Sequence, residues 1–428
     1  MLVKISPDPC YNSGMFTIDE IRKLTKGARV VGQGTRTIKD ISTDTRSIRR
    51  GDLFIPIKGK KFNGRRFIPQ ALRKGALVLD VRDGLKALQD LAAYHRARFD
   101  IPIIGVTGSV GKTTTKDMIA SILSQEMATL KNEENLNNEI GVPLTLLRLS
   151  KKHRAAVIEM AMQDLGEIAL LAKIARPTIS VVTNIGEAHL EFLKTKRNVA
   201  RAKSEIFRYQ RKEDHAVING DDEYFEDLIS NVRCQRPNVM TFGILEKADV
   251  APKALKGIRL PVPGEHNIYN ALAAIAVAKI LKAKKRSIKR GLGSFRPSSK
   301  RMDVIIRRDR VKIINDTYNA NPQSMAAALK VLASLEGRKI AVLGDMYELG
   351  KNSRRAHQRI GELSRKLGVQ TLISIGKLSR DMRADHHFAA KPAAIRKLKQ
   401  IIRAGDQVLV KASRGMKLEE VVEAIRKI

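Results

Sequence analysis

The sequence is poor in cysteine and in aromatic residues, and it contains no tryptophan. Only Cys10 and Cys234 are cysteines, and they lie far apart, so a disulfide framework is not implied. Aromatic residues make up 4% of the chain, which leaves little material for platforms that stack on nucleic-acid bases. No apolar run approaches the roughly eighteen residues that cross a bilayer, and the opening MLVKISPDPC lacks the apolar core of a signal peptide. We therefore expect a cytoplasmic protein without a membrane span.

Acidic residues are also scarce compared with basic ones. The chain has 80 lysines and arginines against 44 aspartates and glutamates, a formal net charge of +36. One interpretation is nucleic-acid binding, because clustered cations neutralise backbone phosphates. The other is a basic surface that serves an anionic substrate. Because the basic residues are spread along the chain, we favour solvated helix faces with one or two anion pockets, and no nucleic-acid partner.

What is present is the pattern of an α/β protein. Its 428 residues exceed a single core and indicate two or three domains, and three blocks follow one another along the chain. Residues 1–98 contain short strand-like pieces and polar turns. Residues 99–296 alternate strands rich in Val and Ile with helices, which indicates a mostly parallel sheet covered on both faces. Residues 297–428 restart that alternation and predict a Rossmann-like domain. The stretch GLGSFRPSSKRMD has the Gly, Pro and Ser content of a linker between the last two domains.

Residues 105–115 read GVTGSVGKTTT and follow a strand of the central domain. The start of the following helix offers backbone N–H groups and a dipole that favour a phosphate. Gly108 and Gly111 let the backbone approach phosphate oxygens, Lys112 can reach the β and γ phosphates, and the Thr113 hydroxyl can ligate Mg²⁺. The spacing is shorter than G-x-x-x-x-G-K-[ST], which argues against an ordinary P-loop kinase.

Glu159 and His189 follow the ends of the next two apolar strands, in AVIEMAM and VVTNIGEAHLE. Because parallel sheets bind ligands beyond the carboxyl ends of their strands, we expect both residues near the phosphate loop. A carboxylate suits Mg²⁺ well, whereas histidine is a soft ligand for it. Taken singly, Glu159 could be a buried ion-pair partner and His189 a loop histidine. Lys203 lies in RAKSEIF, and a single lysine on a helix is normally expected on its solvated face.

Four segments, in order, resemble the central domain of the Mur ligases: TGSVGKTTT, EMAMQDLGEI, TNIGEAHLEF and AKSEIF. Mur ligases are the ATP-dependent amide-bond-forming enzymes of peptidoglycan synthesis, and the short T-G-x-x-G-K-T loop is characteristic of their superfamily. DTYNANPQSM, LGDMYELG with the following His357, and VKASRGMKLEEVV are similar to the branch that adds D-alanyl-D-alanine. STDTRSIRRGDLFIPIKGKKFNGRRF resembles the UDP-sugar-binding domain, although Asn63 and Arg65 replace the usual Asp and His.

The resemblance implies a role for each of several positions. It implies ATP-binding residues at Gly108, Ser109, Val110, Gly111, Lys112, Thr113, Thr114, Asn267, Asn270, Arg301 and Asp316. It implies ligands of two Mg²⁺ ions at Thr113, Glu159, His189 and Lys203, with Lys203 as a carbamate, and catalytic roles for Lys112, His189 and Lys203. It implies substrate contacts at Thr45, Arg46, Asn137, Asn138, Asn319 and Asn321. Asn267 and Asn270 could instead be helix caps, since asparagine favours that position.

The implied reaction is ATP-dependent amide-bond formation between UDP-MurNAc-tripeptide and D-Ala-D-Ala through an acyl phosphate, carried out by a monomer. Two alternatives remain open at this point. The chain could be another amide ligase of the superfamily, although its N-terminal segment argues against folylpolyglutamate synthase, which begins with its ATPase domain. It could also be a nucleotide-gated nucleic-acid-binding protein, an interpretation motivated by the charge of +36.

Overall fold

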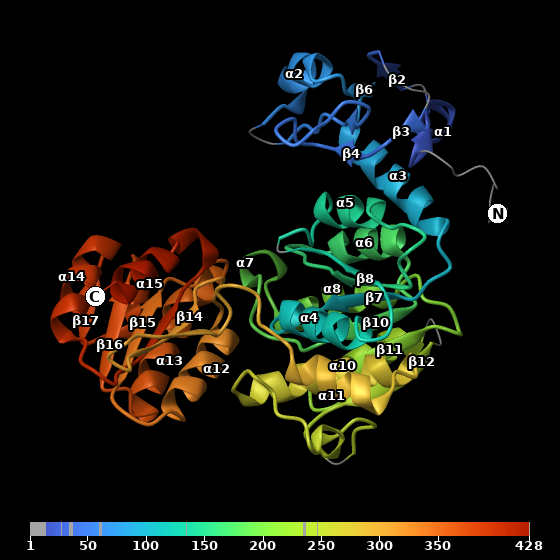
Figure 1. The fold of residues 1–428 in the computed structure, drawn as a ribbon. Coiled ribbons are helices and arrows are strands. Elements are labelled where there is room, and N and C mark those ends of the chain that lie inside the picture. The colour runs from blue at the N-terminus through green and yellow to red at the C-terminus, as the bar shows by residue number, and fades with distance from the viewer. Residues whose placement is uncertain are drawn as a thin grey trace.

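The computed structural model describes residues 14–26, 28–33, 37–59, 62–133, 135–233, 237–245 and 247–427. Cys10 and Cys234 lie outside these ranges, so the expectation about a disulfide stays a prediction. Three regions follow one another along the chain, coloured from blue through green and yellow to red (Figure 1). Each region has a sheet of its own.

The N-terminal region contains short strands, three α-helices and one 3₁₀ helix among its described residues, and 3₁₀ helices are labelled η. In chain order they are β1 (Phe16–Thr17), α1 (Ile18–Leu24), β2 (Arg29–Val31), β3 (Thr37–Ile38), β4 (Ile41–Ser42), β5 (Leu53–Phe54), η1 (Gly64–Phe67), α2 (Ile68–Arg73), β6 (Leu77–Asp80) and α3 (Gly84–Ala97). The main sheet has the order β2-β6-β5-β4, with β2 antiparallel and the other pairings parallel. Helix α3 begins where Asp83 accepts a hydrogen bond from the Lys86 backbone, which satisfies one free N–H of the first turn.

The central region carries the phosphate loop on a sheet whose pairings are all parallel. Its elements are β7 (Ile103–Thr107), α4 (Lys112–Leu123), β8 (Thr129–Lys131), α5 (Gly141–Leu147), β9 (Ala155–Glu159), α6 (Glu167–Ala175), β10 (Ile179–Val182), α7 (Leu190–Leu193), α8 (Lys196–Ser204), η2 (Glu205–Phe207), β11 (His215–Asn219), α9 (Phe225–Arg233), β12 (Asn238–Phe242), η3 (Pro252–Leu255), α10 (Glu265–Ile280) and α11 (Lys285–Gly293). The order is β12-β11-β10-β7-β9-β8. Every residue of β7, β9 and β10 is buried, because apolar cores lie on both faces of this sheet.

The C-terminal region is a second doubly covered α/β unit. Its elements are β13 (Asp303–Ile306), β14 (Lys312–Asp316), α12 (Pro322–Ala333), β15 (Lys339–Gly344), η4 (Gly350–Asn352), α13 (Ser353–Lys366), β16 (Thr371–Ile375), η5 (Ser379–Met382), β17 (His386–Phe388), α14 (Lys391–Ile401), β18 (Gln407–Lys411), η6 (Arg414–Met416) and α15 (Glu419–Arg426). The order is β13-β14-β18-β15-β16-β17, with β13 as an antiparallel edge and all other pairings parallel. One core lies under α12 and α13, and another under α14 and α15.

The predicted fold class, an α/β protein with a largely parallel central sheet and a Rossmann-like C-terminal region, is confirmed. Each large sheet lies inside one of the predicted ranges 1–98, 99–296 and 297–428, and these limits stay our proposal for the domain boundaries. Within the described ranges, none of the helices combines the length and apolar character that spanning a bilayer requires.

Candidate nucleotide-binding and ligation site

The phosphate loop joins β7 to α4 at the carboxyl edge of the central sheet. Gly108 and Gly111 have φ values of +149° and +85°, which other residues rarely adopt. A Cβ atom at Gly108 would lie 1.8 Å from Thr183 Oγ1, and one at Gly111 would lie 2.2 Å from Asn270 Oδ1. Both positions therefore require glycine for their backbone angles and for the close approach of neighbouring segments.

Residues that follow β10 hold the loop in place. Asn184 accepts a hydrogen bond from Val110 N (3.0 Å) through Oδ1 and donates one from Nδ2 to Val110 O (2.9 Å). Ser109 N donates to Asn184 O (3.0 Å), and Thr183 Oγ1 donates to Val110 O (2.6 Å). The first N–H groups of α4 have no intrahelical acceptor, so they stay available for an anion. Sequence reasoning missed Thr183 and Asn184, although their place in TNIGEAHLE, just after a buried strand, was a usable signal.

Lys112 folds back over this loop. Its Nζ donates a hydrogen bond to Gly108 O at 2.8 Å, so the ammonium group lies beside the bend that glycine permits. Burial lowers the pKa of Lys112, the Glu159 carboxylate opposes that change, and the Arg301 charge adds to it. Thr114 lies in the same first turn of α4 as Lys112. The predicted lysine is thus at the loop, and the charge of Arg301 acts on it.

Three predicted residues from separate segments meet beside the loop. Thr113 Oγ1 donates to Glu159 Oε2 (2.7 Å), and Asn137 Nδ2 donates to Glu159 Oε1 (2.8 Å). Asn132, which sequence reasoning missed, contacts the backbone of the same glutamate. Asn132 Oδ1 accepts a hydrogen bond from Glu159 N (2.9 Å), and Asn132 Nδ2 donates one to Glu159 O (3.1 Å). Mg²⁺ usually takes one or two carboxylates together with waters and phosphate oxygens. The hydroxyl of Thr113 and the carboxylate of Glu159 fit that ion.

The other two predicted metal ligands have different surroundings. Lys203, on α8, is 2% exposed, and burial lowers its pKa well below the usual range, with the charge of Lys112 adding to the effect. His189 has a φ of 55°, and its Nδ1 lies 2.6 Å from Glu348 Oε2 of the C-terminal region. The contact with His189 lowers the pKa of Glu348. Lys203 therefore lies within the electrostatic influence of Lys112. His189 instead pairs with Glu348, a carboxylate that sequence reasoning did not single out.

No cluster of three or more His, Cys, Asp or Glu side chains able to hold a metal ion occurs in the part of the chain that the structure describes. Beside the Thr113 hydroxyl and the Glu159 carboxylate, a Mg²⁺ ion would take its other ligands from phosphate oxygens and water. Carbamoylation of Lys203 would add an anionic oxygen to this set.

The two asparagines of α10 are buried and engaged with the protein. Asn270 Nδ2 donates to Asn267 Oδ1 (3.1 Å), and Asn267 Nδ2 donates to Pro263 O (2.7 Å). Thr115 Oγ1, from the phosphate-loop helix, donates to Asn270 Oδ1 (3.2 Å). Neither asparagine caps α10, whose N-cap residue is Gly264. They link α10 to the loop, and their contact with adenine stays a prediction.

Two predicted nucleotide residues lie at the end of the linker and in β14 of the C-terminal region. The guanidinium carbon of Arg301 lies 3.7 Å from the centroid of the Tyr318 ring, and its buried Nε has no hydrogen-bond partner among the described residues. Asp316 ends β14 and accepts hydrogen bonds from Lys411 Nζ (2.5 Å) and Met302 N (3.2 Å). An unsatisfied buried guanidinium nitrogen, whose charge also lowers the pKa of Lys112, suits an anionic ligand.

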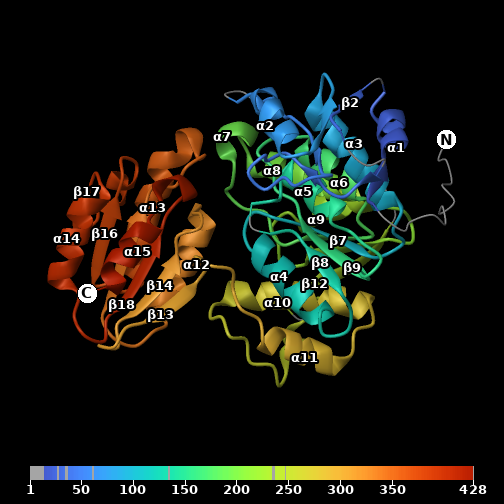
Figure 2. The same cartoon turned by 45° about the horizontal axis from the view of Figure 1, so that its top comes forward.

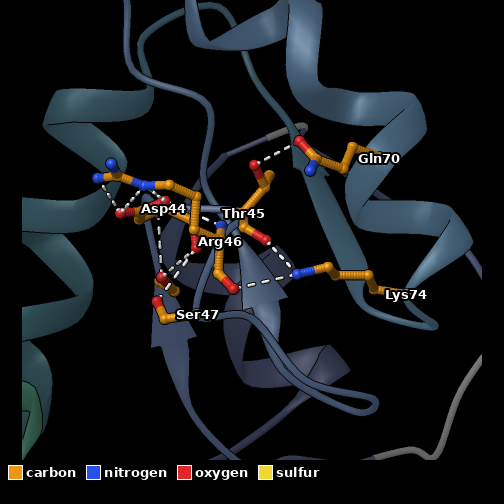
Figure 3. Close-up of polar contacts among 7 residues, drawn as sticks. Asp44, Thr45, Arg46, Ser47, Gln70 and Lys74 are labelled. Atoms are coloured by element: carbon orange, nitrogen blue, oxygen red, sulfur yellow. Dashed lines mark hydrogen bonds and ion pairs between the residues drawn. The ribbon is translucent and has the colours of Figure 1, made fainter.

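Thr45 and Arg46 lie in the N-terminal region, in a small polar network (Figure 3). Thr45 Oγ1 donates to Gln70 Oε1 (2.8 Å), and Lys74 Nζ donates to the carbonyl oxygens of Thr45 (2.8 Å) and Arg46 (3.1 Å). The Arg46 side chain is 88% exposed and pairs with Asp44 at 2.6 Å, which raises the pKa of Arg46. Lys74 thus fixes the backbone of this turn, while the guanidinium group faces solvent.

The remaining predicted substrate residues have local structural roles. Asn138 Oδ1 accepts hydrogen bonds from Ile140 N (3.2 Å) and Gly141 N (2.9 Å) at the start of α5. Asn321 is the N-cap of α12 and forms a capping box with Ser324. Asn319 Oδ1 accepts a hydrogen bond from the next backbone N–H (2.9 Å). Substrate contact at these three positions stays a prediction.

The central and C-terminal regions meet around α7, which both views place at the facing edge (Figures 1 and 2). Besides the pair of His189 with Glu348, Arg359 of α13 lies 2.5 Å from Glu187, and Glu191 N donates to Glu348 O at 3.1 Å. The loop with the predicted metal-binding histidine therefore contacts the C-terminal region directly.

Three family models match the chain. The Mur ligase middle domain matches residues 106–278, the Mur ligase glutamate ligase domain matches 300–414, and the Mur ligase family catalytic domain matches 37–96. The first of these ranges contains the phosphate loop and the cluster of Thr113 with Glu159. A phosphate loop on a parallel sheet, beside a hydroxyl and a carboxylate suited to Mg²⁺, defines a nucleotide-binding α/β protein.

Similar proteins narrow this class. A UDP-N-acetylmuramoyl-tripeptide–D-alanyl-D-alanine ligase from Synechocystis sp. is 40% identical over 424 residues, covering 91% of this chain and 92% of that protein. The crystal structure of MurF from Acinetobacter baumannii has a TM-score of 0.89 and 31% identity, over 96% of this chain and 99% of that one. MurF ligase from Thermotoga maritima in complex with ADP has a TM-score of 0.82 and 28% identity, over 91% and 97%. The chain therefore belongs to the Mur ligase family.

Proposed function

We propose that the chain is an ATP-dependent ligase that joins D-alanyl-D-alanine to the terminal carboxyl group of UDP-MurNAc-tripeptide, making UDP-MurNAc-pentapeptide for peptidoglycan synthesis. The observation that carries this proposal is the phosphate loop with Lys112 folded over it and the pair of Thr113 and Glu159 beside it. The similarity to the Synechocystis ligase, which spans both chains almost completely, supports the choice of substrates.

The chemistry begins with a carboxylate, which is a poor acyl donor. Transfer of the γ-phosphoryl group of ATP to a carboxylate oxygen makes an acyl phosphate and releases ADP. The dipeptide amine then attacks the acyl carbon, the bond from that carbon to the phosphate oxygen breaks, and inorganic phosphate leaves while the amine loses a proton. The N–H groups at the start of α4 hold the nucleotide phosphates, and Lys112 stabilises the negative charge on the transferred group.

The residues present fit Mg²⁺ and a carbamate. Thr113 and Glu159 would hold one ion, and His189 with a carbamoylated Lys203 would hold the second. Bound Mg²⁺ screens the repulsion between phosphates and carboxylate. Burial lowers the pKa of Lys203, which favours the neutral amine, the form that can capture CO₂. His189 would have to release Glu348 to serve as a ligand.

Asp316→Asn is expected to raise the KM for ATP by about 10- to 100-fold, since hydrogen bonds to a charged group contribute about 1.5–3 kcal/mol. We infer that this carboxylate accepts hydrogen bonds from the ribose hydroxyls, beside its present partner Lys411 at 2.5 Å. The KM for the dipeptide should change little. Asp309→Asn, which alters an ion pair with Arg307 in the same region, is the matched control. Equal rises in both KM values would contradict the ribose role.

The function is tested by phosphate release from ATP with purified UDP-MurNAc-tripeptide and a choice of amine. We expect release with D-Ala-D-Ala and none with single amino acids or glutamate. Incorporation of a single amino acid without the dipeptide would indicate another ligase of the superfamily. If DNA or RNA stimulated phosphate release from ATP and UDP-MurNAc-tripeptide did not, the nucleic-acid-binding alternative would be favoured. We expect the protein to be a monomer and to be located in the cytoplasm.

A further inference from the structure

Asp117 is a buried carboxylate of α4 that the reaction as described does not use. It is 5% exposed and lies one turn beyond the phosphate loop. Lys131 Nζ lies 2.6 Å from its Oδ1, Lys116 Nζ lies 3.4 Å from the same oxygen, and Ser298 Oγ donates to Oδ2 at 2.7 Å. Burial raises the pKa of Asp117, but the charges of Lys116 and Lys131 outweigh that effect and the net shift is downward. The group is therefore an ionised acceptor for the serine.

Ser298 belongs to the linker between α11 and β13, which passes α4 on its way to the C-terminal region (Figures 1 and 2). A cavity of about 250 Å³ lies here, lined in part by Asp117, Lys131, Phe295 and Arg296. The hydrogen bond from Ser298 holds the linker to α4, and Ser121 Oγ of α4 bonds Gly291 O near the end of α11 at 2.7 Å. Further along, Lys300 O accepts a hydrogen bond from Tyr318 N at 3.1 Å, and Lys300 Nζ lies 3.1 Å from Glu419.

Ser298 is also the start of the turn that leads to Arg301. Arg301 N donates to Ser298 O at 3.2 Å, so the two residues are linked by one hydrogen-bonded turn. The guanidinium group of Arg301 stacks over the Tyr318 ring, and its positive charge lowers the pKa of Lys112 at the phosphate loop. A shift of Ser298 would be passed along this turn to the arginine.

We propose that Asp117 is a positioning residue, which ties the linker to α4 through Ser298 and so holds Arg301 at the nucleotide site. The phosphate loop and Arg301 are then both placed by the same helix, α4, although they belong to different regions of the chain. A side chain at a reactive site keeps the geometry that the reaction requires only when hydrogen bonds and packing from neighbouring residues fix its position. The inference rests on the proposed nucleotide-binding function and adds the residues that align the two regions for it.

The test is Ser298→Ala, with Ser299→Ala as the matched control on the exposed neighbouring serine. Removing one hydrogen bond is expected to weaken ADP binding and raise the KM for ATP by about 2- to 10-fold, while Ser299→Ala leaves both unchanged. Ser298→Thr keeps the hydroxyl group and should restore binding. Asp117→Asn is a poorer test, since it leaves Lys116 and Lys131 without a buried counter-charge.

A double-mutant cycle with Arg301→Ala separates positioning from a general effect on folding. If Ser298 acts through Arg301, the serine change should have no further effect on ADP affinity once the arginine is absent. Additive losses, or equal losses in Ser298→Ala and Ser299→Ala, would overturn the inference. Calorimetric titration with ADP needs neither the tripeptide nor the dipeptide. A failure of the proposed ligation reaction would therefore be seen separately, in the wild-type phosphate-release assay.

Discussion

Lys112→Ala is expected to lower dipeptide-dependent phosphate release by about 10³-fold, the upper end of what removal of one preorganised charge donor costs. The ammonium group is held at 2.8 Å from Gly108 O, so it needs little rearrangement to meet a γ-phosphoryl group on the loop. Charge on that group is spread over its oxygens during transfer, and the protein contributes mainly by positioning cations around it. Alanine supplies no cation at this place, so the positive charge next to Gly108 O is lost.

The control for Lys112→Ala is Lys366→Ala, which removes one positive charge from the exposed end of α13. Its turnover should equal that of the unchanged chain, so the general loss of positive charge is separated from the loss at the loop. Circular dichroism should show both variants folded, because within the described residues the Nζ of Lys112 donates its hydrogen bond to a loop carbonyl and not to a core group. Turnover of Lys112→Ala within twofold of the unchanged chain would contradict the role in phosphoryl transfer.

The sequence was a good guide to the loop and to the ligands that follow neighbouring strands. Glu159 lies opposite Val106 in the register of β9 with β7, and this register places it beside the loop that β7 leads into. Strands of a parallel sheet end at one edge, so a polar residue just after a buried run is carried to the same place. This is why Thr113 and Glu159, 46 positions apart, could be predicted to meet.

The contacts between regions could not be predicted in this way. The pairs of His189 with Glu348 and of Glu187 with Arg359 depend on how the C-terminal region sits against the central one. Contacts between side chains that lie so far apart in the chain leave no periodic pattern in a sequence. The bond from Ser298 to Asp117 is of the same kind, because it joins residues 181 positions apart.

Lys203→Ala is expected to lower ligation by about 10²- to 10³-fold, comparable to the loss of other preorganised charges. The side chain is 2% exposed and lies near Lys112, and burial lowers its pKa. A buried ammonium group beside a second cation is unfavourable, whereas a neutral amine can react with CO₂ to give a carbamate and a proton. The product is an anion, which attracts Lys112 instead of repelling it and offers oxygen atoms to a hard cation.

Two measurements distinguish this carbamate from a merely structural lysine. Formate or acetate should partly restore ligation by Lys203→Ala, because a small carboxylate can replace the missing oxygens, and removal of CO₂ should slow the unchanged chain. Incubation with ¹³C-bicarbonate should give a carbamate carbon signal in NMR spectra that Lys203→Ala lacks and Lys196→Ala retains. Lys196 is the matched control, since it lies on the same helix but pairs with Glu223 at the surface. A fully active chain without CO₂, with no such signal, would show that Lys203 works as an unmodified amine or only as a packing residue.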